Sequence, residues 1–352
     1  MEENKKIELL CIGNAIVDVY ARADPSQLDA LGVTNPVQHV PRELAGRILG
    51  DLRESADGGL TLVSGGAAAN VAKIASMLGT NSAFLGCVGK DDLAGYFAQE
   101  LRGAGVVSVL RQSGGETGLC LVLDSGAGGT RIAASPGASL DLCEDDVSED
   151  LISRADAVVL DGYMLERERL VRRVLRLASR HGIPIALDAA SVFQIGERTE
   201  AVLQYSRNYP LIVFMNADES IMFYDTIRKG ARADGAMSER EKEAFILREI
   251  CPVLKLITEG DIFPVIVIKL GGRGAVVLAG GNVHRVGTFA IVPGNTVGAG
   301  DAFCAAFVSA WIRGKSIREC ASLGNRVARE VLMVPGTRVK KGKLAWMSRL
   351  LR

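Results

Sequence analysis

Short apolar runs alternate with longer amphipathic segments through the second half of the chain. The runs typical of buried strands span residues 158–160, 183–187, 211–214, 263–268 and 275–278. Helical periodicity follows the first and third of them, at 167–180 and 216–223. Strands that alternate with helices favour a parallel sheet with helices on both faces. The pattern therefore predicts an α/β fold with a doubly wound, largely parallel sheet flanked by helices.

The first third of the chain has a different pattern. A continuous apolar run at 7–13 predicts one buried strand. The β-rich stretches after it are short and are separated by polar or glycine-rich loops, at 19–22, 36–40, 118–123 and 130–134. They predict a small β-sheet apart from the main sheet, with strands drawn from about 15–40 and 116–135. Because no repeat, linker or low-complexity tract occurs, we expect a single domain over 1–352.

Three helices are predicted in the last third of the chain. Residues 238–250 form an amphipathic helix that we expect to end at Pro252. Residues 302–312 are apolar nearly all round, broken only by Ser309, which is typical of a buried helix. Residues 315–332 form the last core helix.

The buried helix is preceded by Gly298, Ala299 and Gly300, and Asp301 lies in its first turn. Free backbone N–H groups and the positive end of the helix dipole make such a terminus an anion site. A carboxylate beside it can take a proton from a hydroxyl while the amides hold a transferring phosphoryl group. Close helix packing, with Asp301 as a partner of the dipole, explains the same residues equally well.

Composition narrows the class of protein. The 352 residues include 41 basic and 41 acidic side chains, which gives no sign of a nucleic-acid partner. Seven cysteines form no C-x-x-C pair, and three histidines form no zinc pattern with them. No apolar run reaches transmembrane length, and the charged residues 1–6 do not resemble a signal peptide. We expect a cytoplasmic protein without a membrane partner, either a monomer or a homodimer.

The segment 295–301, Asn-Thr-Val-Gly-Ala-Gly-Asp, resembles the D-T-x-G-A-G-D signature of the ribokinase-like (PfkB) sugar and nucleoside kinases. The resemblance runs from about residue 7 to 337 in the family's motif order. It implies a kinase in which Asp301 is the catalytic base and the amides of Gly298, Ala299 and Gly300 form the anion hole. It also implies that the small sheet is a lid over the acceptor, and that ATP and Mg²⁺ are cofactors.

Two earlier motifs match the family's acceptor site. Asp18 is expected at the end of a central strand, where the resemblance implies that it binds sugar hydroxyls; the alternative is a turn residue. Residues 64–70 resemble G-G-x-x-x-N, which implies that Gly65 and Gly66 bring the backbone close to the acceptor and that Asn70 points its amide at a hydroxyl. The alternative for this segment is a flexible turn into an alanine-rich helix.

Two later motifs match the nucleotide side. Asn216 and Glu219 fit N-x-x-E, whose glutamate acts on magnesium through water, and they fit a helix capping box equally well. The glycine-rich turn at 269–274 reads as a hairpin, and the resemblance implies that it borders the nucleotide through Lys269, Gly271, Gly272 and Gly274. Asn325, on the last core helix, is implied to lie near the adenine.

Departures from the family pattern concern the cation and the acceptor. Asn295 replaces the usual first Asp of the signature, so we expect a weakened site for a monovalent cation such as K⁺. Residues 13–18 fit the G-N-x-ϕ-ϕ-D form of adenosine-kinase-type members, where ϕ is aliphatic. Ile16 and Tyr163 are then expected to form walls that pack on a base, which favours a nucleoside as the small-molecule substrate.

Other functions remain open on the sequence. A furanose sugar kinase of the ribose or fructose type is the first alternative, and a non-catalytic sugar or nucleotide sensor on the same fold is the second. A sensor needs no base, so retention of Asp301 argues against it. The G-x-x-x-x-G-K-[ST] loop and the G-x-G-x-x-G dinucleotide fingerprint are both absent, which disfavours P-loop enzymes and dehydrogenases.

Overall fold

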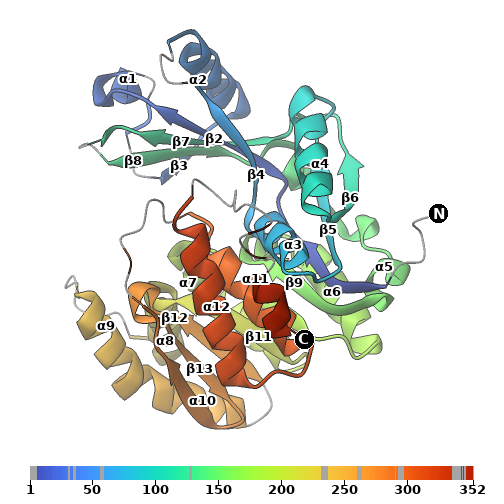
Figure 1. The fold of residues 1–352 in the computed structure, drawn as a ribbon, viewed down its shortest axis with the longest axis vertical. Helices are drawn as coiled ribbons and strands as arrows, with labels where there is room; N and C mark the ends of the chain where they lie inside the picture. Colours follow the sequence, from blue (N-terminus) through green and yellow to red (C-terminus); the bar gives the residue numbers. More distant parts are fainter. Residues whose placement is uncertain are drawn as a thin grey trace.

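The computed structural model describes residues 6–30, 32–34, 37–55, 59–126, 129–230, 237–259, 264–289, 291, 297–334, 342, 344 and 346–351. Within these ranges it contains two sheets, and helices cover both faces of the larger one (Figure 1). This is the α/β, ribokinase-like arrangement that the hydrophobic pattern and the signature predict.

The main sheet has nine strands in the order β14-β13-β12-β11-β10-β9-β1-β5-β6. Its seven parallel strands are β1 (Ile7–Ile12), β5 (Ser82–Val88), β6 (Val107–Gln112), β9 (Ala155–Asp161), β10 (Ile185–Asp188), β11 (Leu211–Asn216) and β12 (Val265–Lys269). Two antiparallel strands complete one edge, β13 (Ala275–Ala279) and β14 (Asn282–Val286). The central parallel strands are mostly apolar because helices bury them from both sides, whereas β6, at the edge of the sheet, is partly or fully exposed along its length.

The described residues form twelve α-helices and one π-helical segment. Those of the first half are α1 (Pro25–Ala30), α2 (Arg42–Ser55), α3 (Ala67–Met77), α4 (Asp92–Ala104), α5 (Glu149–Ser153) and α6 (Glu168–Arg180). Those of the second half are α7 (Val192–Ser206), α8 (Ala217–Arg228), α9 (Glu239–Phe245), the π-helical η5 (Ile246–Ile250), α10 (Cys251–Glu259), α11 (Ala299–Trp311) and α12 (Ile317–Val331).

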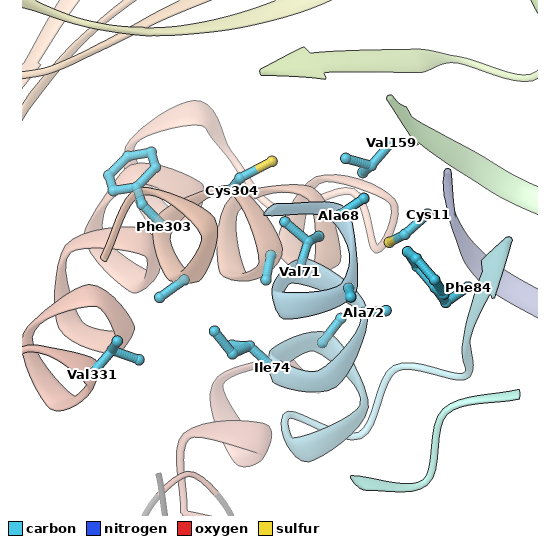
Figure 2. Packing of buried hydrophobic residues seen from close by; sticks show 14 of the residues in the cluster. Cys11, Ala68, Val71, Ala72, Ile74, Phe84, Val159, Phe303, Cys304 and Val331 are labelled. Carbon is cyan, nitrogen blue, oxygen red and sulfur yellow. The ribbon is translucent and has the colours of Figure 1, made fainter. Parts of the chain in front are cut away.

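Two hydrophobic cores lie on opposite faces of the main sheet. Along β1, Leu9 and Cys11 belong to the core shared with α3, α4, α11 and α12, whereas Leu10 and Ile12 belong to the core shared with α6, α7, α8 and α10. Successive strand residues point to opposite faces, so one strand serves both cores. Figure 2 shows the first core, where α3 lies between Phe84 of β5 and the α11 residue Phe303. The two helices that carry the predicted base and acceptor amide are therefore packed together.

The second sheet has five strands in the order β3-β8-β7-β2-β4. They are β3 (Val37–His39), β8 (Thr130–Ser135), β7 (Gly118–Asp124), β2 (Ile16–Arg22) and β4 (Thr61–Gly65). Figure 1 shows this small sheet at one end of the molecule, with α1 and α2 on its outer side. Four strands come from the predicted stretches, and β4 joins them from outside those stretches.

The prediction that the helix at 238–250 ends at Pro252 was wrong. Ser238 does cap the start of α9, but the helical path continues through the π-helical η5 into α10, which ends at Glu259. A proline breaks a helix because it lacks an N–H and its ring clashes with a carbonyl of the preceding turn. Pro252 is the second residue of α10, just after the π-helical segment 246–250, whose wider backbone changes that spacing. The helical path therefore accommodates the proline there.

Candidate active site

Polar residues gather at the carboxyl ends of the parallel strands. Asp161 ends β9 and Asp188 ends β10, and the two are paired in register. Asn216 and Lys269 end β11 and β12 and are paired in the same way. Parallel strands present their carboxyl ends at one edge of a sheet, which is where open α/β sheets bind ligands. The edge therefore brings together residues from four separate segments.

Asp301 lies at this edge, in the first turn of α11. The N-cap residue Gly298 has φ of 82°, in the left-handed region, and it supplies no side chain to cap the helix. Small residues at Ala299 and Gly300 keep the first turn open. Asp301 Oδ2 accepts a hydrogen bond of 2.8 Å from Asn70 Nδ2, in the first turn of α3. The predicted base and the predicted acceptor amide are thus in direct contact, 231 residues apart in the chain.

The surroundings of Asp301 tune its proton affinity. The pKa of the carboxyl is raised to about 6, chiefly by burial and also by the nearby charge of Asp188. The hydrogen bond from Asn70 and the charges of Lys269 and Lys73 oppose that rise in pKa. A carboxylate with a pKa near 6 is ionised at neutral pH and is a stronger base than an ordinary aspartate.

Asp18 is not at the end of a central strand, so the expectation for its place was wrong. Residues 13–15 carry the chain out of the main sheet, and Asp18 is the third residue of β2 in the small sheet, opposite Cys120 of β7. The side chain is buried, and burial raises its pKa to about 7, while Lys73 lowers it. The charge of Asp301 also acts on Asp18. The small sheet therefore places a second carboxylate near that of Asp301.

Gly65 and Gly66 allow the end of β4 and the start of α3 to pack closely against residues 14–18. A Cβ on Gly65 would lie 2.3 Å from the carboxylate atoms of Asp18. Gly66 has φ of 88°, and a Cβ there would lie 2.1 Å from the carbonyl oxygen of Asn14. Only glycine combines the left-handed backbone with the absence of a side chain. These two positions hold Asp18 and the first turn of α3 together.

Lys73 is a site residue that the sequence analysis missed. It is 4% exposed, one turn beyond Asn70 on α3, and its ammonium donates to the carbonyl and the hydroxyl oxygen of Ser64. Its charge lowers the pKa of both Asp18 and Asp301. A single lysine within an alanine-rich apolar helix was the available signal, because such a charge is rarely buried without partners.

Asp161 and Asp188 were also missed. Asp161 is buried, and burial raises its pKa to about 7. Its Oδ1 accepts a hydrogen bond of 3.1 Å from the backbone N–H of Tyr163, which places this half-buried tyrosine at the same edge. Asp188 Oδ2 lies 2.8 Å from Lys269 Nζ, and both side chains are largely buried. The signal for each was an aspartate that ends a predicted apolar strand.

Asn216 and Glu219 form the capping box that was the alternative interpretation. Glu219 Oε2 accepts from the backbone N–H of Asn216 at 2.7 Å, and Asn216 Oδ1 accepts from that of Glu219 at 2.9 Å. The Glu219 side chain is buried, and burial raises its pKa to about 7, while Lys269 lowers it. Among the described residues, no group of three His, Cys, Asp or Glu side chains is arranged to hold a metal ion.

The predicted nucleotide residues come together from two parts of the chain. Gly274 closes the turn between β12 and β13, and a Cβ there would lie 2.1 Å from the carbonyl oxygen of Val286. Asn325 of α12 donates its amide to the carbonyl oxygens of Val286 and Gly287, at 3.3 and 3.2 Å. Gly271 has φ of 54°, and Gly272 is open to its surroundings. The glycine-rich turn and Asn325 thus meet at the end of β14.

Two remaining expectations concern Ile16 and Asn295. Ile16 begins β2, two residues before Asp18 and on the same face, and it is partly exposed. Asn295 lies outside the described residues, as do residues 335–337 of the loop expected beside it. Within the described part of the chain, no helix is long and apolar enough to cross a membrane.

Comparisons with known proteins agree with this geometry. The adenosine kinase of Schizophyllum commune is 24% identical over 361 residues, which cover 96% of this chain and 98% of that protein. An uncharacterized sugar kinase of Archaeoglobus fulgidus is 23% identical over 274 residues, 75% of this chain and 96% of that one. The crystal structure of adenosine kinase from Sinorhizobium meliloti matches with a TM-score of 0.81 at 25% identity, covering 99% of this chain and 100% of that one.

The family model for the pfkB family carbohydrate kinases matches residues 51–342, which is most of the chain. This range includes the lid strands β4, β7 and β8, the helix α3 and the Gly-Ala-Gly-Asp segment. The chain therefore belongs to the pfkB family carbohydrate kinases, and it is a phosphotransferase with an alcohol group as acceptor.

Proposed function

We propose that this kinase transfers the terminal phosphoryl group of ATP to a hydroxyl of a nucleoside, with Asp301 as the base. The observation that carries the proposal is the position of Asp301 at the uncapped N-terminus of α11, in contact with Asn70 and within the field of Asp18. The Asp301 carboxylate thus lies between the anion site at the start of α11 and the Asp18 carboxylate, which is suited to bind sugar hydroxyls. A sensor would need no base there.

The proposed reaction is an in-line displacement. Asp301 removes the proton from the acceptor hydroxyl, whose oxygen bonds to the γ-phosphorus as the bond to the bridging oxygen of ADP breaks. The backbone amides of Gly298, Ala299 and Gly300 stabilise the charge on the transferring group. Asp18, Gly66 and Asn70 fix the acceptor. The products are ADP and the phosphorylated acceptor.

Kinases of this family use ATP and magnesium. Magnesium is usually held by substrate phosphates with one or two carboxylates, often through water. The donors at this edge fit that mode, because Glu219 is a buried carboxylate whose oxygens are already engaged by Asn216. Glu219 would then act on the ion through water. Lys269, Gly271, Gly272, Gly274 and Asn325 would border the nucleotide.

The small sheet would serve as a lid. It carries Asp18, and it meets the main domain through the glycine pair that precedes α3. Closing such a sheet over the acceptor excludes water, which would otherwise compete for the phosphoryl group. The nucleoside assignment rests on Ile16, which offers an aliphatic wall where a hydroxyl partner would be polar, and on Tyr163 as an aromatic wall.

A phosphorylation screen tests the acceptor. Purified protein with ATP and magnesium chloride is offered adenosine, other nucleosides, ribose and fructose, and product is measured by mass. We expect the nucleosides to be phosphorylated most efficiently. If ribose or fructose were phosphorylated efficiently and adenosine were not, the protein would be a kinase of furanose sugars, and the nucleoside proposal would be wrong.

Variants of the two proposed walls should weaken nucleoside binding. Stacking on an aromatic side chain contributes about 1–3 kcal/mol per base. Tyr163→Ala is therefore expected to raise the KM for adenosine by roughly tenfold. Ile16→Asn replaces an apolar contact, worth about 1.5–3 kcal/mol when fully buried, and should raise it by a similar factor. The KM for ATP serves as the internal control, because Tyr163 follows β9 and Ile16 begins β2, whereas the proposed nucleotide turn joins β12 and β13. If both variants kept the KM for adenosine of wild type, the adenine ring would have to bind outside these two walls.

The pH dependence of kcat/KM should follow Asp301. The base must be ionised, and its pKa is raised to about 6, so activity should fall as the pH drops through 6. The hydrogen bond from Asn70 favours the ionised form, so Asn70→Ala should move this acidic limb to higher pH. Asn208→Ala, at an exposed position, is the matched control. A limb that stays in place in Asn70→Ala would show that another group controls it.

A further inference from the structure

The ion pair between Asp188 and Lys269 lies directly beneath the anion site. Lys269 Nζ is 2.8 Å from Asp188 Oδ2, and the two side chains are 14% and 12% exposed. A Cβ built on Gly300 would lie 3.2 Å from Lys269 Nζ and 3.9 Å from Lys269 Cε. The ammonium group therefore rests against the backbone of the first turn of α11. A positive charge at this point adds to the field of the helix N-terminus.

Opposing effects act on the pKa of Lys269. The charges of Asp188 and Glu219 hold its pKa well above the usual range, although burial acts in the opposite direction. The lysine is thus fully charged at neutral pH in a site that excludes much of the solvent. A buried cation keeps most of its electrostatic effect on a neighbouring anion, because the surrounding medium screens it weakly.

Asp188 is the group that fixes this charge in place. Lysine has a long flexible side chain, and a single strong partner restricts where its ammonium lies. Asp188 ends β10, one strand away from β11 and two from the β12 strand that carries Lys269, so its carboxylate is held by the sheet itself. Without it, the lysine could turn toward Glu219, the next charge acting on it.

We propose that Asp188 is a positioning residue that holds the Lys269 ammonium beside Gly300, where Lys269 binds the transferring phosphoryl group. This inference rests on the proposed function, since it places the phosphoryl group at the start of α11. Lys269 would then supply a fixed side-chain cation in addition to the three backbone amides. Asp188 would act only through Lys269, and it would touch neither the acceptor nor the nucleotide.

A double-mutant cycle tests the coupling. Lys269→Met is expected to lower kcat about 100-fold, as loss of one donor to a developing charge does. Asp188→Asn should lower kcat about tenfold, because the lysine remains but is misplaced. The double variant should be no worse than Lys269→Met alone, within about threefold. Losses that multiply in the double variant, or a kcat within twofold of wild type in Asp188→Asn, would overturn the proposal.

The pH profile gives a signature that general loosening of the fold would not produce. Among the described residues, the charged or polar groups that interact with Asp301 are Asn70 and Lys73 of α3, Asp18 of β2, Cys304 of α11, Asp161, Asp188 and Lys269. Asp188 raises the pKa of Asp301 and Lys269 lowers it. Lys269→Met should therefore move the acidic limb of kcat/KM to higher pH. In Asp188→Asn the loss of the carboxylate and the displacement of the lysine act on the pKa of Asp301 in opposite directions, so its limb should stay closer to that of wild type. An acidic limb that Lys269→Met leaves in place would contradict the proposal.

Binding measurements separate this inference from the proposed function. Titration calorimetry with magnesium should show that Lys269→Met weakens ATP more than ADP, because ADP lacks the terminal phosphoryl group. Equal losses for ATP and ADP would overturn the role of Lys269, whether or not the wild type phosphorylates a nucleoside. Asp156→Asn is the matched control, since Asp156 pairs with Lys6 at 2.9 Å on the surface, and it should change neither binding nor kcat.

Discussion

Asp301→Asn is expected to lower kcat by about 10²–10⁴-fold, as loss of a general base does, and to make the protein more stable. Asparagine keeps an oxygen that accepts the hydrogen bond from Asn70, so the geometry of the site should persist. Binding of the nucleotide and the acceptor should therefore stay close to that of wild type. Rates at saturating substrate, with both dissociation constants, provide the measurement.

The gain in stability follows from the same burial. The folded protein raises the pKa of Asp301 from 3.8 to about 6, so the unfolded chain holds the ionised form more readily. The ionised Asp301 therefore destabilises the folded protein. This destabilisation is fully present above pH 7 and shrinks as the pH falls from 6 to 4. Asparagine carries no such cost, and a gain on the order of 1–3 kcal/mol is expected at pH 8.

Thermal unfolding at pH 8 and at pH 4.5 tests this gain. The melting temperature of Asp301→Asn should exceed that of wild type at pH 8, and the difference should narrow at pH 4.5. Asp92→Asn is the matched control, because Asp92 is an exposed acid in the first turn of α4. A kcat within threefold of wild type would remove Asp301 from the role of base, whatever happens to stability.

Gly65→Ala is expected to raise the KM for the acceptor by roughly 10- to 100-fold. A Cβ at this position would lie 2.3 Å from the Asp18 carboxylate, so Asp18 must move. A hydrogen bond to a charged group contributes about 1.5–3 kcal/mol, and the displaced carboxylate would lose its bonds to the acceptor hydroxyls. The backbone of Gly65 does not lie in the left-handed region, so alanine itself adds no backbone strain.

Steady-state kinetics with varied acceptor and varied ATP provide the measurement. The KM for ATP should stay close to that of wild type, because the nucleotide turn lies on β12 and β13. Gly95→Ala is the matched control, since a Cβ on that helical glycine meets nothing within 4 Å. If Gly65→Ala bound the acceptor as wild type does, Asp18 could not be its partner.

Local features of this chain were predictable from the sequence because they depend on residues close to one another along the chain. The alternation of apolar runs and helices indicated the main sheet, and the capping box at Asn216 was evident from residues three apart. The start of the buried helix at Gly298 to Asp301 was equally predictable, because adjacent residues determine where a helix begins. These elements owe their form to backbone geometry and periodicity.

The partners of the buried charges required the tertiary structure. Asn70 meets Asp301 across 231 residues, and Lys269 meets Asp188 across 81. Neither pairing leaves a trace in local sequence, because it depends on which strands and helices pack side by side. The place of Asp18 was mispredicted although it lies within the stretch 15–40 expected to supply small-sheet strands. The first central strand, β1, ends at Ile12, and the pairing of β2 with β4 and β7 shows to which sheet Asp18 belongs. Sequence determined which residues could perform the chemistry, and packing decided which of them touch.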